Sequence, residues 1–126
     1  MGIGCPACAD RGFNPTAPGV LYLVHFSAHN LLKIGVTTAV AQSDRISQHE
    51  KRGWKKKAVW DVETGDEAVR LENAVLAWWK LEKCRFAGRH DVPENDGYTE
   101  SIFIESITPD DVIEYVERHL NDGTRR

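Results

Sequence analysis

Four polar residues lie within segments that otherwise resemble packed secondary structure, and their side chains could exchange protons, bind an anion and hold a cation. Tyr22 lies in the apolar run VLYLVHF. Arg45 and His49 are four residues apart in a segment of helical composition, so they share one helix face. Glu72 interrupts the apolar stripe of a longer predicted helix, where a carboxylate is costly unless it is paired or binds a metal.

Each of these residues also has a purely structural explanation. A tyrosine in a strand is usually part of the core, an arginine and a histidine one helical turn apart are commonly exposed, and a glutamate beside an apolar stripe often lies at its edge. Taken one at a time, the structural explanation is favoured. Their combination in one short chain favours a functional site.

The first elements that would position these side chains are a hairpin and a short helix. The segment from Gly19 to the SAHN turn and the segment 31–37 are rich in apolar and β-branched residues, which predicts two paired strands. Residues 42–52 predict a helix, with Ser43 or Asp44 able to cap its start and Gly53 able to end it.

The second half of the chain predicts two more strands and two more helices. Apolar residues recur at helical spacing from caps at Thr64 or Asp66 up to about Lys83. Thr108 and Pro109 introduce a closing helix. The predicted ranges are a strand at 54–62, the long helix, a loop at 84–97, a strand at 98–106 and a helix at 110–120.

The expected order of elements is therefore ββαβαβα. Adjacent hairpin strands make the sheet at least partly antiparallel, so the expected class is α+β, or mixed α/β. We expect a small antiparallel or mixed sheet of three to four strands, flanked by about three helices.

Length and composition predict one cytoplasmic domain. The chain has 126 residues, which suits a single core. We expect residues 1–18 to form an irregular N-terminal arm and residues 19–121 to form the domain. No apolar run approaches the roughly 20 residues of a membrane helix, and the N-terminus lacks the pattern of a secretory signal.

Charge is unevenly distributed along the chain. The net charge of −3 argues against a protein that coats nucleic acid with its whole surface. A basic run nonetheless follows the helix of Arg45 and His49, and it is either a solvated turn or a set of phosphate contacts. The residues of this run are Lys51, Arg52, Lys55, Lys56 and Lys57.

In their order and spacing, these residues resemble the GIY-YIG nuclease superfamily. Val20-Leu21-Tyr22 stands in place of the first tripeptide and Lys33-Ile34-Gly35, after ten intervening residues, in place of the second. Arg45, His49 and Glu72 follow in the family's order. The CPxCA segment before the first strand and DGYTES near the end resemble a phage-associated and actinobacterial branch, so the resemblance covers most of the chain.

The resemblance implies hydrolysis of DNA phosphodiesters with Mg²⁺ or Mn²⁺ as the cofactor. Glu72 would hold the ion, because a carboxylate suits the oxygen preference of Mg²⁺. Tyr22 would act as general base or position the attacking water. Arg45 would neutralise the phosphate, and His49 would assist proton transfer or orient Tyr22.

Two features depart from the family pattern. Lys33 replaces the second tyrosine, and its ammonium, close to Tyr22 on the adjacent strand, would favour the phenolate and make Tyr22 a better base. The family's late asparagine corresponds to no single position, with Asn73, Asn95 and the Thr99-Glu100 pair as alternatives. Glu100 is either a second carboxylate for the metal or a strand residue turned to solvent.

Cys5 and Cys8 have the CxxC spacing of a zinc knuckle. In a cytoplasmic chain, metal binding or redox chemistry is expected before a disulfide. A tetrahedral zinc site needs four ligands, and Cys84 and His90 could supply the other two. The alternative is a pair of reduced thiols without metal.

The leading hypothesis is therefore a small metal-dependent DNA endonuclease, which obtains target choice from its own surface, a homodimer or a partner protein. The runner-up is a non-catalytic nucleic-acid-binding module that keeps the fold without turnover. A zinc module that binds only protein is a third possibility.

Overall fold

The hairpin formed by β1 (Gly19–Phe26) and β2 (Leu31–Thr38) lies at the centre of the sheet. β3 (Trp54–Val62) pairs with the other edge of β1, and the short β4 (Ser101–Phe103) pairs with β2. The strand order is β3-β1-β2-β4, and each neighbouring pair is antiparallel. The computed structural model describes residues 16–93 and 98–124, and its sheet and helices confirm the expected α+β class.

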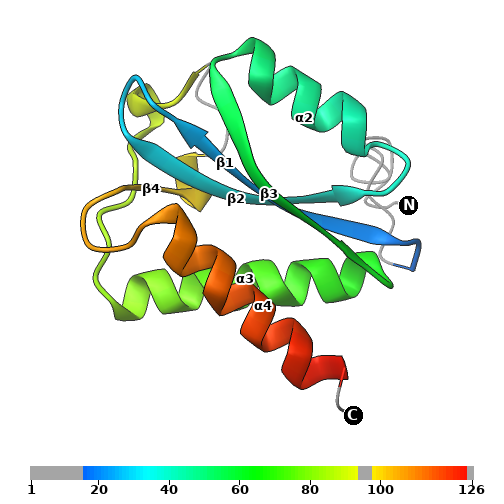
Figure 1. Ribbon diagram of the computed structural model, residues 1–126. Helices are drawn as coiled ribbons and strands as arrows, with labels where there is room; N and C mark the ends of the chain where they lie inside the picture. The colour runs from blue at the N-terminus through cyan, green and yellow to red at the C-terminus, as the bar shows by residue number, and fades with distance from the viewer. Residues whose placement is uncertain (1–15, 94–97, 125–126) are drawn as a thin grey trace, which may run out of the picture.

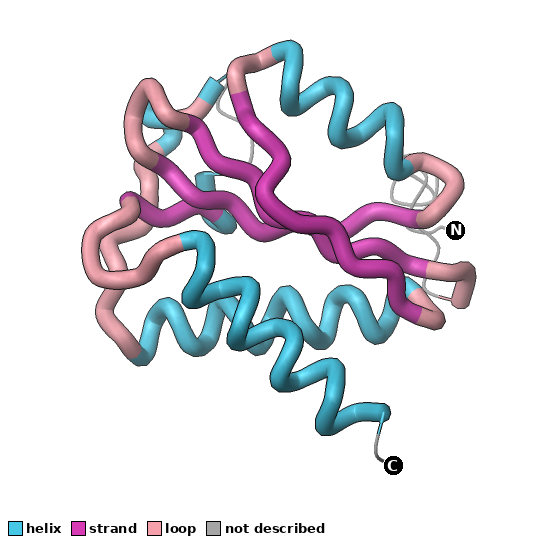
Figure 2. Tube along the Cα trace, in the orientation of Figure 1, coloured by secondary structure: helices cyan, strands magenta, loops and turns pink. Residues whose placement is uncertain are grey.

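Helices cover both faces of this sheet. α2 (Gln42–Lys51) lies on one face, and α3 (Gly65–Leu81) and α4 (Pro109–Thr124) lie on the other (Figures 1 and 2). The 3-10 helices η1 (Arg89–Asp91) and η3 (Tyr98–Glu100) occur between α3 and β4 in the chain. None of the helices in the described ranges is long and apolar enough to cross a membrane.

The two faces of the hairpin bury two separate cores. Leu21 and Leu23 of β1 pack with Trp79 of α3 and with residues of α4. Tyr22 and Val24, which alternate with them, face α2 and pack with its Ile46. Because side chains alternate along a strand, this pattern places a polar residue at position 22 under α2 and keeps the opposite face apolar.

The register of the hairpin explains Gly35. Tyr22 pairs with Gly35, and Val24 pairs with Lys33, so Lys33 lies diagonally across the ladder from Tyr22 on the same face. The ring of Tyr22 lies over Gly35, since a Cβ added there would come within 2.4 Å of Cζ and Oη of that ring. Gly35 is therefore required by a close approach of the tyrosine ring.

A β-bulge in β3 changes which face its residues occupy. Leu23 pairs with Ala58 and Val24 pairs with Lys56, which leaves Lys57 as the extra residue. Trp54 consequently packs in the α2 core, whereas Trp60, an even number of residues later, packs in the opposite core. Without the bulge these two tryptophans would share one face.

The predicted helix ends are partly correct. Thr64 accepts a hydrogen bond from the backbone N–H of Glu67 and caps α3 as expected. Gly53 follows α2 with a positive φ of 103°, which suits a glycine just beyond a helix. The predicted cap at Ser43 or Asp44 is wrong, because α2 already begins at Gln42 and no side chain caps its start.

The last predicted strand, 98–106, is much shorter than expected. Only Ser101–Phe103 pair with β2, and the ladder ends where the backbone N–H of Ile104 donates to Asn30, at the turn of the hairpin. On the other side, η3 contacts β2 and η1 instead of extending the ladder. The predicted loop at 84–97 contains η1 and one bridge, between Phe86 and Ile102.

The contact between Tyr22 and Gly35 predicts that Gly35→Ala destabilises the protein by about 2 kcal/mol, because the added methyl group overpacks the tyrosine ring. Urea unfolding measures this cost. In a Tyr22→Ala background, which removes the ring, the same substitution is expected to cost much less. An equal cost in both backgrounds would show that the ring is not what excludes the methyl group.

Candidate active site

Three polar side chains from three different elements meet beneath α2. The hydroxyl of Tyr22 in β1 lies 2.9 Å from Nε2 of His49 in α2. Nζ of Lys33 in β2 lies 3.4 Å from the same nitrogen. All three residues are buried, with 1 to 3% of their surface exposed. The resemblance implied that Tyr22, Lys33 and His49 share one site with Arg45 and Glu72, and the structure joins the first three through His49.

The surrounding packing fixes the imidazole of His49. Ile46, one helical turn earlier, is buried in the same core and holds this face of α2 against the sheet. The ring of Trp54 meets the imidazole edge-on, with 6.3 Å between ring centroids. The Tyr22 ring is tilted against it at 5.4 Å. Aromatic packing on two sides therefore orients Nε2 toward the strands.

Nε2 of His49 lies at the centre of these polar contacts. An imidazole nitrogen is either a donor or an acceptor, so Tyr22 and Lys33 cannot both donate to Nε2 at once. The shorter distance is to Tyr22, which gives the hydroxyl a base within hydrogen-bonding reach. Lys33 adds an amine that can stabilise negative charge or give up a proton in turn.

Glu72 of α3 is a partly buried carboxylate that interacts electrostatically with Lys33. The pKa of Glu72 is raised to about 7, first by burial and then by the negative charge of Glu100, while the positive charge of Lys33 acts to lower it. Glu100 ends η3 and directly precedes Ser101, which pairs with Lys33. Glu72, Glu100 and Lys33 therefore interact electrostatically near the start of β4.

The two carboxylates offer oxygen ligands of the kind that Mg²⁺ or Mn²⁺ prefers. Magnesium is usually held by one or two carboxylates together with water and substrate phosphates. Within the described ranges, no group of three or more histidine, cysteine or acidic side chains forms a metal-binding cluster. Glu72 and Glu100 are coupled electrostatically, and their carboxylates have the ligand chemistry that an open divalent site would use. They do not form a closed protein cage.

Arg45 does not take part in the contacts of Tyr22, Lys33 and His49. It lies one helical turn before His49 and is half-buried. Its side chain makes no hydrogen bond or ion pair with any residue that the structure describes. A guanidinium in this position is available to an anion, but its place in the site remains a prediction.

The predicted basic turn is mostly a strand. Arg52 and Gly53 form the turn after α2, whereas Lys55, Lys56 and Lys57 belong to β3 and are exposed. The bulge at Lys57 allows three consecutive lysines to reach solvent. Lysines on an edge strand also prevent edge-to-edge association, so they have a structural role as well.

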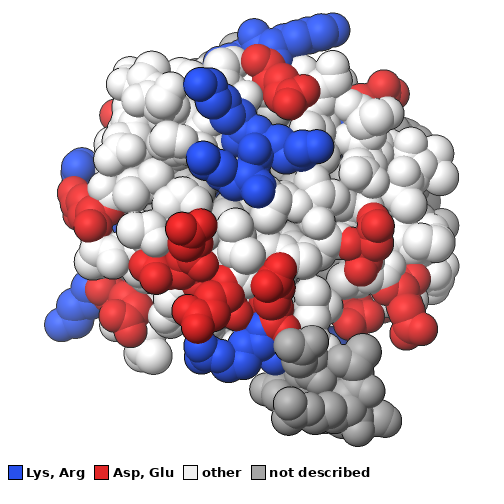
Figure 3. Space-filling model, viewed as in Figure 1, with Lys and Arg blue, Asp and Glu red and all other residues white. Residues whose placement is uncertain are grey.

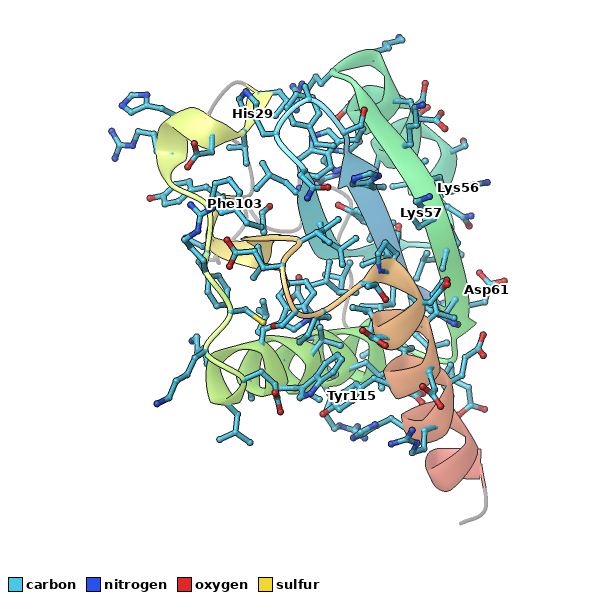
Figure 4. The ribbon with its side chains drawn as sticks, turned by 60° about the vertical axis from the view of Figure 1, so that its left-hand side comes forward. His29, Lys56, Lys57, Asp61, Phe103 and Tyr115 are labelled. Atoms are coloured by element: carbon cyan, nitrogen blue, oxygen red, sulfur yellow. The ribbon has the colours of Figure 1, made fainter. Side chains whose placement is uncertain are left out.

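The lysines of β3 lie in the positive part of an asymmetric surface. Figure 3 shows lysine and arginine side chains gathered over the upper part of this face, with acidic side chains mainly below. Lys56 and Lys57 project from β3, and Asp61 lies further along the same strand (Figure 4). Positive charge is thus concentrated where α2 ends and β3 begins.

The structure does not test the predicted zinc site. Cys5 and Cys8 lie outside the described residues. Cys84 is half-buried after α3, and burial, followed by the charges of Glu82 and Glu105, raises the pKa of its thiol. His90 is exposed in η1. The four-ligand zinc site therefore remains a prediction.

Sequence reasoning missed two residues that shape the site. Trp54 packs against His49, although its position just after a glycine gave no sign of this. Ser101 is fully buried and pairs with Lys33. In the sequence it is the last residue of the GYTES motif, and it was not singled out there. A polar residue at a buried position of a short strand was the available signal for Ser101.

Comparison of the chain with family models, curated proteins and solved structures found no match.

The raised pKa of Glu72 predicts that this residue lowers the free energy of unfolding at high pH and not at low pH. Below about pH 4.5 the carboxyl is protonated in both the folded and unfolded states, so it carries no penalty. As the pH rises through 7, the folded state must ionise a buried group that the unfolded state has already ionised. At pH 8 without metal, Glu72→Gln is expected to be more stable than wild type by on the order of 2 kcal/mol.

Chemical unfolding at pH 4 and pH 8 in EDTA measures this difference. The exposed carboxylate Glu117 on α4 offers a matched control, Glu117→Gln, whose effect should be small at both pH values. A gain in stability for Glu72→Gln that is the same at pH 4 and pH 8 would contradict the assigned pKa shift.

Proposed function

We propose that this protein is a metal-dependent DNA endonuclease of the GIY-YIG type. The observation that carries the proposal is the contact of Tyr22, Lys33 and His49, together with a carboxylate, Glu72, coupled electrostatically to Lys33. These are residues that the resemblance assigned to one site. Tyr22, Lys33 and His49 come from β1, β2 and α2, so their contact is not a consequence of sequence proximity.

The proposed roles follow from the contacts. His49 accepts the Tyr22 proton, and Tyr22 in turn deprotonates or orients the attacking water. Lys33 and Arg45 balance negative charge on the phosphoryl oxygens. Glu72, with Glu100 beside it, would hold Mg²⁺ or Mn²⁺, which when bound supplies Lewis-acid stabilisation of the phosphate.

The basic residues at the end of α2 and the start of β3 are proposed as the phosphate contacts. His49 lies in the last turn of α2, two residues before Lys51, so the catalytic contacts and the basic surface are neighbours along the chain. Phosphate contacts give affinity without base sequence information. We propose Lys51, Arg52, Lys55, Lys56 and Lys57 for this role.

We propose a cytoplasmic location and a target choice that depends on the protein's own surface, a second copy or a partner protein. A zinc ion held by Cys5, Cys8, Cys84 and His90 would fasten the N-terminal arm to the region after α3. These proposals extend the resemblance and are independent of the hydrolytic site.

Cleavage of supercoiled plasmid in Mg²⁺ or Mn²⁺ tests the proposed activity. Wild type is expected to nick or linearise the plasmid, and Glu72→Gln and Tyr22→Phe are each expected to slow the reaction by about 100-fold or more. Tyr22→Phe keeps the ring over Gly35 and removes only the hydroxyl that contacts His49. Glu117→Gln on α4 is the matched control and should cleave as wild type does.

DNA affinity, measured over a range of salt concentrations, separates catalysis from binding. The two active-site variants should bind duplex as tightly as wild type, with a similar salt dependence. Cleavage that survives Glu72→Gln would reject this site. Salt-sensitive binding without cleavage of any duplex, flap or modified DNA would instead identify a non-catalytic binding module.

A further inference from the structure

The three side chains that meet beneath α2 are closed off from solvent. Tyr22, Lys33 and His49 expose only 1 to 3% of their surface. His49 of α2 also contacts both the Tyr22 hydroxyl and the Lys33 amine. In this closed arrangement a DNA phosphate cannot contact either of those two groups. Hydrolysis at this site therefore requires that one element moves.

α2 is held on the sheet by little apolar surface. Its buried residues are Ile46 and His49, so Ile46 is its single buried apolar side chain. By contrast, α3 buries Val75 and Trp79 in the opposite core and also packs against α4 (Figure 1). Regions with few buried apolar contacts open locally at a lower free energy than global unfolding. α2 is therefore the element that can leave the site while the sheet and the opposite core stay intact.

The two ends of α2 can act as pivots. The turn at 39–41 joins α2 to β2, and Val40 in this turn is 94% exposed, so its side chain adds no packing there. At the other end, Gly53 joins α2 to β3 with a positive φ of 103°. Hinges in proteins are a few residues at element ends that absorb changes in φ and ψ. Both connections are of this kind.

We propose that α2 is a cover over the active site, which lifts to admit a DNA phosphate and then closes on it. The purpose of this movement rests on the proposed function, but the movement itself can be measured without DNA. Arg45 and His49 lie one turn apart on α2, whereas Tyr22 and Lys33 belong to the sheet. Closure would bring a guanidinium and an imidazole from one side, and a hydroxyl and an amine from the other, around one phosphate.

The lysines of β3 would stay in place during this movement. Lys55, Lys56 and Lys57 lie beyond the pivot at Gly53, in a strand that pairs with β1 from Trp54 to Val62. Phosphate contacts position a nucleic acid without reading its bases. DNA held by these lysines would therefore lie beside the cover while α2 is lifted.

Thiol labelling tests the movement directly. The variants Ile46→Cys, under α2, and Val75→Cys, in the opposite core, place a thiol at positions that are 7% and 1% exposed in the native chain. Each full chain is treated with N-ethylmaleimide, and peptide mass spectrometry separates the new thiol from the native cysteines. Ile46→Cys is expected to be labelled at least about tenfold faster than Val75→Cys. Its rate should change little in low urea, because a local opening exposes little surface.

The native His49 provides a second measurement, because Ile46→Cys itself weakens the packing of α2. Diethyl pyrocarbonate modifies an imidazole nitrogen that it can reach, and peptide mass spectrometry separates His49 from the exposed His119 in the unaltered chain. His119 should react quickly. His49 should react more slowly, at a rate that low urea hardly changes.

Two results overturn the cover. One is a ratio of labelling rates below tenfold for the two cysteine variants. The other is modification of His49 that rises with urea as steeply as global unfolding does. Either result can occur while plasmid is cut in Mn²⁺, which leaves the endonuclease proposal standing. Local opening of α2 without any cutting of plasmid supports the cover and counts against the endonuclease.

Discussion

The site depends on the buried imidazole of His49, which contacts one side chain from each of two strands. His49 joins α2 to the hairpin through Tyr22 and Lys33, and all three side chains are almost completely removed from water. Buried polar groups are costly unless they have partners, so moving α2 away from the sheet would leave a hydroxyl, an imidazole and an amine without this contact. The same contact that could transfer protons therefore also fixes the helix on the sheet.

The register of the strands positions the side chains that contact His49. Gly35 lets the Tyr22 ring lie against β2, and the diagonal register places Lys33 on the same face. The bulge at Lys57 brings Trp54 under α2 against His49 and at the same time turns three lysines to solvent. One local irregularity thus contributes both to the packing of the site and to the positive surface beside it.

Much of this arrangement was predictable because it depends on local patterns. Alternating apolar residues predicted the hairpin, helical spacing predicted α3, and Thr64 predicted its start. The shortness of β4 was not predictable, because its end is set by where β2 turns at Asn30, a contact distant in sequence. The electrostatic link between Glu72 and Glu100 likewise depends on how η3 meets the edge of β2, which residue types alone do not fix.

We propose that Glu72 and Glu100, which are coupled electrostatically to Lys33, hold a divalent cation. Titration with Mn²⁺, followed by two-dimensional amide NMR spectra, tests this most directly because the paramagnetic ion broadens nearby resonances. The account predicts early broadening around Lys33, Glu72 and Glu100, and its loss in Glu72→Gln. Broadening confined to the acidic residues of α4, such as Glu114 and Glu117, would contradict the account.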